Sequence, residues 1–117
     1  TQISDLGDLQ ISLNKLSIRT GTQGTMTTTT ETMTNNAVSF EARAKLNDDC
    51  NISSFQVSND GGLTYNDNDK QYNLISNLNK LISFTTTGNQ IVVKITLVSN
   101  SDNDKPEIDS FTLLVKH

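Results

Sequence analysis

The stretch "VSFEARAKL", residues 38–46, decides the fold because apolar and polar side chains alternate along its whole length. Successive side chains of a β-strand point to opposite faces, so this alternation is typical of a strand with one face in the core and one in solvent. The side chains expected to face the core are Val38, Phe40, Ala42, Ala44 and Leu46. Those expected to face solvent are Ser39, Glu41, Arg43 and Lys45.

Three further stretches support the same fold class. "ISSFQVS" (residues 52–58) and "EIDSFTLLVK" (residues 107–116) also alternate, whereas "QIVVKITLVS" (residues 90–99) is apolar on both faces, as in a central strand. Their inward side chains are expected to be Phe55, Val57, Ile91, Val93, Ile95, Leu97, Phe111, Leu113 and Val115. Short strands separated by turn-forming residues predict an all-β chain, built as an antiparallel β-sandwich or jelly roll.

The segment "VSNDGGLTY", residues 57–65, predicts a hairpin within this fold. Asn, Asp and Gly tolerate a positive φ, which the tight turns of hairpins require. We therefore expect a turn at Asp60-Gly61-Gly62 and a short return strand over residues 63–65.

Composition limits the classes of function. The chain has 117 residues, enough for one domain with its own core, but only 33% are hydrophobic and no Trp occurs. Such a core is either thin or completed by other subunits. The net charge is −4 without a basic cluster, so charge-driven binding to nucleic acid or to an anionic membrane is not expected. Cys50 is the only cysteine, which excludes an internal disulfide and predicts a small buried apolar residue.

The first residues allow two structures. Leu6, Leu9, Leu13 and Leu16 have the spacing of a coiled-coil seam, which would join chains through a short helical stalk. Leu9, Ile11 and Leu13 also alternate with polar residues, as in an extended strand. We divide the chain into a stalk-like or linker segment (residues 1–19), a Thr-rich linker or edge strand (residues 20–36) and the sandwich domain (residues 37–117). Because it begins without Met, we expect the sequence to be a fragment of a longer protein.

Catalytic residues are not expected. The single histidine, His117, is the last residue and is either a native terminus or the start of a tag, so it is not held in place for a Ser-His-Asp triad. Zinc ligands of the His/Cys type do not form a cluster. Glu41, placed beside Arg43 on an outward strand position, is typical of a solvated ion pair rather than of a glycosidase acid. We predict a protein that is not an enzyme and has no cofactor.

Two acidic loops resemble parts of calcium sites. Asp67 and Asp69 have a D-x-D spacing that Asp102 and Asp104 repeat. An EF-hand loop also needs a Gly at its sixth position and a Glu at its twelfth, and neither stretch has them. We therefore expect polar connections at both places rather than metal sites.

The loop bounded by Tyr65 and Tyr72 has residues of the types that bind saccharides. Sugar recognition uses aromatic rings for stacking and planar polar side chains for hydrogen bonds. Tyr65 and Tyr72 are the aromatic candidates, although either ring can also be half-buried at a strand end. The polar candidates beside them are Asn66, Asp67, Asn68 and Gln71.

Two stretches resemble a known group of proteins. "SFQVSNDGGLTY" followed by "QIVVKITLVSNSDNDKPEIDSFTL" resembles a β-sandwich module of bacteriophage tail and surface proteins, over residues 37–116. Tyr65 stands where that pattern commonly has Trp, which leaves the role of this aromatic open. "QISDLGDL" (residues 2–9) resembles short segments ahead of trimeric stalks in phage fibre and baseplate proteins, without the helix that often follows there.

The resemblance implies a homotrimer that assembles with other virion proteins. We therefore expect a non-enzymatic structural or host-surface-binding domain of a virion fibre, tail or baseplate, with cell-surface polysaccharide as its ligand. The alternative is a carbohydrate-binding module attached to a secreted bacterial glycosidase, which would place the chain outside the cell rather than in a virion.

Overall fold

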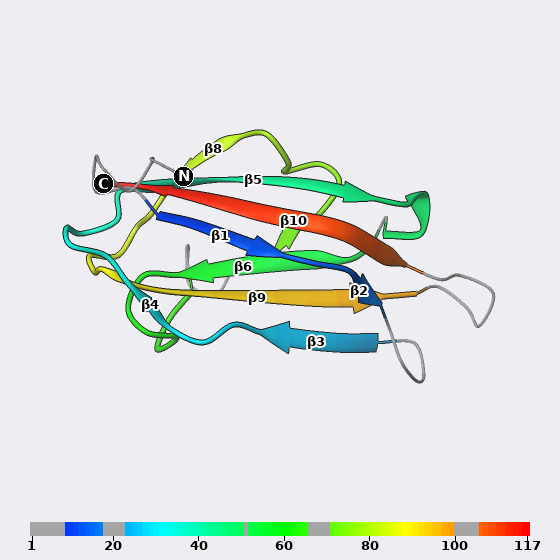
Figure 1. Ribbon diagram of the computed structural model, residues 1–117, viewed down its shortest axis with the longest axis horizontal. Coiled ribbons are helices and arrows are strands. Elements are labelled where there is room, and N and C mark those ends of the chain that lie inside the picture. Colours follow the sequence, from blue (N-terminus) through cyan, green and yellow to red (C-terminus); the bar gives the residue numbers. More distant parts are fainter. Residues whose placement is uncertain (1–8, 18–22, 51, 66–70, 100–105) are drawn as a thin grey trace.

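A computed structural model describes residues 9–17, 23–50, 52–65, 71–99 and 106–117. The described chain forms two antiparallel five-stranded sheets that pack face to face, so the predicted all-β sandwich is confirmed (Figure 1). The first sheet contains β1 (Leu9–Leu13), β2 (Leu16–Ser17), β5 (Ser39–Leu46), β8 (Leu81–Ser83) and β10 (Glu107–Lys116). The second sheet contains β3 (Gln23–Thr27), β4 (Glu31–Thr32), β6 (Ser54–Ser58), β7 (Tyr72–Asn73) and β9 (Gln90–Val98).

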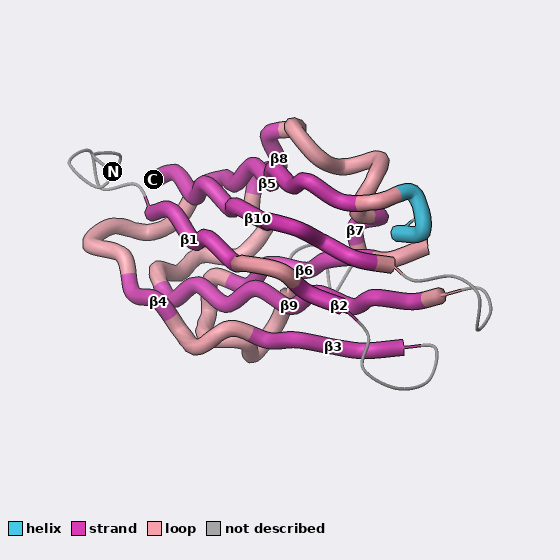
Figure 2. The backbone as a smooth tube through the Cα atoms, turned by 45° about the vertical axis from the view of Figure 1, so that its right-hand side comes forward, coloured by secondary structure: helices cyan, strands magenta, loops and turns pink. Residues whose placement is uncertain are grey.

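The chain crosses repeatedly between the two sheets. The strand order is β1-β10-β5-β8 in the first sheet, where β2 also pairs with β10, and β3-β9-β6-β7 in the second, where β4 also pairs with β9. In the described part of the chain, one 3-10 turn, η2 (Asp48–Cys50), follows β5, as the tube in Figure 2 shows. Long strands from distant parts of the sequence therefore lie side by side at the centre of each sheet.

The core lies between the sheets and is centred on phenylalanine rings. Phe40 of β5 meets Phe55 of β6 edge to face, with ring centroids 6.4 Å apart. Phe55 also meets Phe111 of β10 at 5.8 Å. Aromatic pairs of this geometry contribute about 0.5–1.5 kcal/mol beyond the area that they bury. The alternation in β5, β9 and β10 thus places its apolar side chains where the sequence predicts them.

Val38 is an exception, because 57% of its surface is exposed. The backbone N–H of Ala37 donates to the Gly88 carbonyl and that of Val38 to the Lys116 carbonyl. Ala37 is consequently the buried residue, and the alternation begins only with β5 at Ser39. The inward placement predicted for Val38 is wrong.

The first described residues, 9–17, form strands rather than a helical stalk. β1 pairs with β10 in the register Leu9↔Val115, Ile11↔Leu113 and Leu13↔Phe111. Three of the four leucines are described, and they pack on the core of their own chain: Leu9, Leu13 and Leu16. The prediction that they form a coiled-coil seam is therefore wrong. Leu6 lies outside the described residues.

The assumed domain boundaries also change, because β1 and β2 belong to the first sheet and β3 to the second. β3 is the terminal strand of its sheet, in agreement with the edge-strand alternative for the Thr-rich segment. The described parts of residues 1–36 are thus built into the sandwich rather than attached to it.

The predicted turn at residues 60–62 is confirmed, but the return strand is not. Gly61 and Gly62 have φ values of 76° and 91°, a conformation that favours glycine. Residues 63–65 form no strand, and β6 pairs instead with β9 on one side and with β7 on the other. β7 pairs only with Ser54 and Phe55, at the start of β6, and the chain leaves the sheet after the turn.

Cys50 is fully buried, as predicted. Burial raises the pKa of its thiol, whose Sγ lies 3.5 Å from the Glu107 carbonyl oxygen.

The described part of the chain contains no helix with the length and apolar character that crossing a bilayer requires.

Candidate polar binding face

The outer face of the second sheet carries a row of short polar side chains. Phe55, Val57 and Ile95 point into the core, so their neighbours in β6 and β9 point outward. Lys94 is half-buried among them. The other outward side chains at the centre of the face are almost fully buried, with exposures of 0–9%: Ser54, Gln56, Ser58, Val92 and Thr96.

Residues 61–65, here named the covering segment, lie over part of this face. A β-carbon built on Gly62 would come within 3.9 Å of Val92 Cγ2 and 3.7 Å of Tyr65 Oη. Tyr65 in turn lies beside Lys94, whose Nζ is 5.7 Å from the centre of the tyrosine ring. The aromatic side chain is thus fixed on the outer face by a cation–π contact.

Asp60 holds the covering segment in place. Its Oδ1 accepts hydrogen bonds from Ser58 Oγ at 2.6 Å and from the Thr64 backbone N–H at 2.9 Å, and its Oδ2 accepts one from Thr64 Oγ1. The Gly62 N–H donates to Ser58 Oγ at 3.0 Å. Partial burial works to raise the pKa of Asp60, but the hydrogen bonds from Ser58 and Thr64 outweigh it and lower this pKa below its usual value.

The predicted saccharide residues separate into three groups. Tyr65 is half-buried on the outer face, and Gln71 is exposed just before β7, with its Oε1 3.5 Å from Ser54 Oγ of the same face. Tyr72 is only 4% exposed and packs in the core, with ring centroids 6.0 Å from Phe40 and 5.6 Å from Phe55. The prediction that a sugar stacks on Tyr72 is therefore wrong. Asn66, Asp67 and Asn68 lie outside the described residues.

The residues considered for metal binding and catalysis are not brought together. Asp67, Asp69, Asp102 and Asp104 all lie outside the described ranges. Within those ranges, no group of three His, Cys, Asp or Glu side chains could hold a metal ion.

Glu41 forms a surface ion pair, as the strand pattern predicts. Its Oε2 lies 3.0 Å from Arg43 Nη2 on the outer side of β5. Glu107 forms the second ion pair among the described residues. Its Oε1 lies 3.5 Å from Lys15 Nζ. Both carboxylates therefore face cations at the surface of the first sheet.

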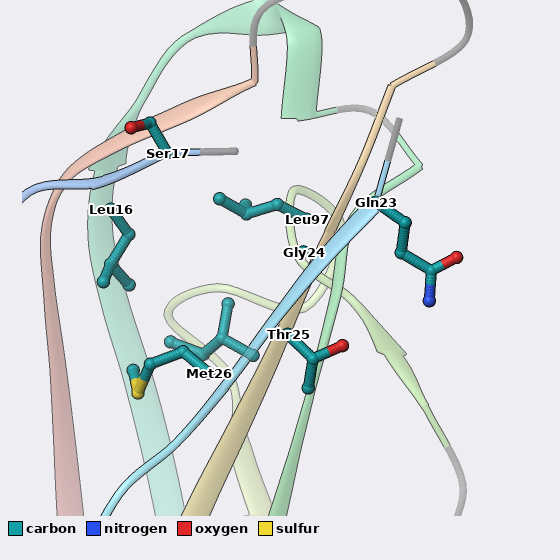
Figure 3. A pocket seen from close by; sticks show the side chains of 8 residues that line it. Leu16, Ser17, Gln23, Gly24, Thr25, Met26 and Leu97 are labelled. Atoms are coloured by element: carbon teal, nitrogen blue, oxygen red, sulfur yellow. The ribbon is translucent and has the colours of Figure 1, made fainter. Parts of the chain in front are cut away.

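A cleft of about 250 Å³ opens between the two sheets where β2 and β3 pass each other (Figure 3). Leu16, Met26 and Leu97 converge on it, whereas Gln23 and Thr25 point away. A second cleft of about 300 Å³ lies between β1 and the segment after β3, and Glu31 is the one carboxylate among its described lining residues. Neither cleft is evident from the sequence, because each is lined from two sheets. The one local signal is Gly24, which lies opposite inward Leu97 and leaves that position without a side chain.

Comparison with protein-family models, with curated proteins and with solved structures finds no match for this chain.

Proposed function

We propose that this chain is a non-enzymatic structural and surface-binding domain whose ligand is a cell-surface polysaccharide. The observation that carries the proposal is the position of Tyr65, which the Asp60 network and Lys94 fix on a polar sheet face. A ring of fixed orientation with amide and hydroxyl groups nearby suits a saccharide, which has apolar ring faces and many hydroxyls. Gln71 supplies an exposed amide at the same face.

The wider setting that we propose is a virion fibre, tail or baseplate. It is supported by the resemblance of residues 37–116 to sandwich modules of phage tail and surface proteins. A homotrimer in contact with other virion proteins belongs to this proposal. A coiled coil through Leu9, Leu13 and Leu16 does not, because these side chains pack on the core of their own chain.

A carbohydrate-binding module of a secreted glycosidase would bind the same chemical class of ligand. The solution mass separates the two settings, since the fibre domain is expected to be a trimer and the appended module a monomer. A gene neighbourhood of tail and lysis genes, rather than hydrolase genes, would support the fibre.

The binding proposal is tested with the variants Tyr65→Ala and Tyr65→Phe. Affinity electrophoresis in gels that contain purified bacterial surface polysaccharide reports binding without knowledge of the repeating unit. We expect Tyr65→Ala to weaken binding about five- to tenfold and Tyr65→Phe to retain most of it, because the ring face makes the contact.

Leu63→Ala is the matched control, since Leu63 belongs to the same covering segment and is 85% exposed. Equal retardation of the wild type, Tyr65→Ala and Leu63→Ala would overturn the proposed site. Failure of the wild type to bind any of the polysaccharides would overturn the proposed function.

A further inference from the structure

The outer face of the second sheet has an uneven charge distribution. Its outward positions, identified from the strand registers, are Gln23, Thr25, Thr27, Ser54, Gln56, Ser58, Asn73, Gln90, Val92, Lys94, Thr96 and Val98. Among these described positions, Lys94 alone carries a charge. Lys94 is therefore the one cation among these strand positions and lies next to the ring that we propose binds saccharide. The Asp60 carboxylate at the same face is engaged by hydrogen bonds from Ser58 and Thr64.

The ammonium group of Lys94 has neutral neighbours on both adjoining strands. The register places Thr27 of β3 and Gln56 of β6 directly opposite Lys94. No described carboxylate forms an ion pair with it, whereas Arg43 on the outer face of the first sheet is paired with Glu41. The Tyr65 ring is the charge-stabilising contact that the structure records for this ammonium.

The half-buried position of Lys94 makes a further anionic contact favourable. A cation that is partly removed from water has lost hydration that a neutral hydroxyl or amide replaces only in part. An anionic oxygen restores it through a charge-assisted hydrogen bond, which is about twice as strong as a neutral one. The protein as a whole carries a net charge of −4 and repels anions at long range, so the attraction depends on contact with this one residue.

We infer that the saccharide bound at Tyr65 is an anionic one, and that Lys94 selects it by binding its carboxylate or phosphate group. This inference rests on the proposed polysaccharide function and adds the ligand class. A uronic acid and a sugar- or glycerol-linked phosphate present the same chemistry to Lys94, namely anionic oxygens next to hydroxyls.

The test compares three purified polymers by titration calorimetry with the whole chain: polygalacturonate as the carboxylate probe, polyglycerol phosphate as the phosphate probe and dextran as the neutral probe. We expect at least one polyanion to bind about tenfold more tightly than dextran at low ionic strength. The polyanion that binds identifies the source of the negative group. Added salt should reduce the difference, because exposed charges are screened.

The variant Lys94→Met keeps most of the aliphatic stem and removes the charge. It is expected to bind the preferred polyanion about tenfold less tightly and to lose less affinity for dextran, so that the preference for the polyanion falls, while Lys94→Arg keeps the preference. Lys45→Met is the matched control, because Lys45 is exposed on the first sheet. Thermal unfolding of each variant shows that the fold is retained.

The inference and the proposed function fail in different ways. Tyr65-dependent binding of dextran with no preference for either polyanion, or a preference that Lys94→Met leaves intact, would overturn the inference alone. Binding of none of the three polymers and of no bacterial polysaccharide preparation would overturn the proposed function and the inference together.

Discussion

The backbone carbonyl oxygen of Asn59 packs directly against Gly88. A larger residue would not fit at position 88, because its β-carbon would lie closer to this oxygen than real β-carbons come to other heavy atoms. This contact joins the end of β6 to the segment before β9. The Asn59 side chain continues the junction, because its Nδ2 donates to the Thr86 carbonyl at 2.8 Å and its Oδ1 accepts from Thr86 Oγ1. The chain turns near residues 59–62 and 86–90 thus hold each other in position.

Gly88→Ala is expected to lower the free energy of unfolding by about 2–3 kcal/mol, because backbone atoms rather than a flexible side chain must move. Urea unfolding followed by circular dichroism measures the change. The control is Gly24→Ala, at the open cleft between β2 and β3, where we expect a change of less than about 1 kcal/mol. Equal stability of the two variants would contradict the contact at Gly88.

Asn59→Ala is expected to destabilise the fold by about 2–3 kcal/mol. Asn59 is fully buried, so its removal leaves the Thr86 carbonyl and hydroxyl without this partner. The same unfolding measurement applies, with exposed Asn36→Ala as the control and no change expected for it. A similar small effect at both positions would show that the junction does not depend on the Asn59 side chain.

Asp60→Asn should change the pH dependence of stability. Because hydrogen bonds lower the folded-state pKa of Asp60, its contribution to stability is fully present above the unfolded value of 3.8 and is lost as the pH falls through the folded value. The wild type is therefore expected to melt at a higher temperature than Asp60→Asn at neutral pH, with a difference that disappears in acid below pH 3.8. A difference that stays constant throughout a pH series of melting curves would contradict the role assigned to this carboxylate.

Leu13→Asn distinguishes an N-terminal strand from a helical stalk. Leu13 packs on the core opposite Phe111, so we expect the substitution to lower the free energy of unfolding by about 1–2 kcal/mol at any protein concentration. Ser12→Asn, at the neighbouring exposed position, is the control. If Leu13→Asn only dissociates an oligomer and leaves the free energy of unfolding of the single chain unchanged, Leu13 belongs to a seam between chains instead.

The sequence predicts the sandwich from the long strands because their alternation repeats over many residues. In β5 and β10 the inward side chains, such as Ala42 and Leu113, are those that the pattern indicates. The pattern fails at the N-terminus for a different reason. Leu9 and Leu13 satisfy both a helical and an extended spacing, and only pairing with β10 decides between them.

The candidate site was only partly predictable. Tyr65 and Tyr72 look equivalent in sequence, yet Tyr72 enters the core as a partner of Phe55 in β6, while Tyr65 stays on the outer face. The predicted return strand after Gly62 does not form. The Thr64 N–H, which would have donated to a partner strand, donates to the Asp60 carboxylate instead. Lys94 has no local signal in the sequence, since its contact with Tyr65 joins residues from two distant segments.

The most direct test of the proposed site is a nuclear magnetic resonance titration of the labelled protein with fragments of the polyanion that binds. We expect the largest chemical-shift changes at the ring of Tyr65, the side chain of Lys94 and the amide of Gln71, all at the outer face of the second sheet. Changes confined to Leu16, Met26 and Leu97 in the cleft between the sheets, with the signals of Tyr65 and Lys94 unmoved, would contradict this account.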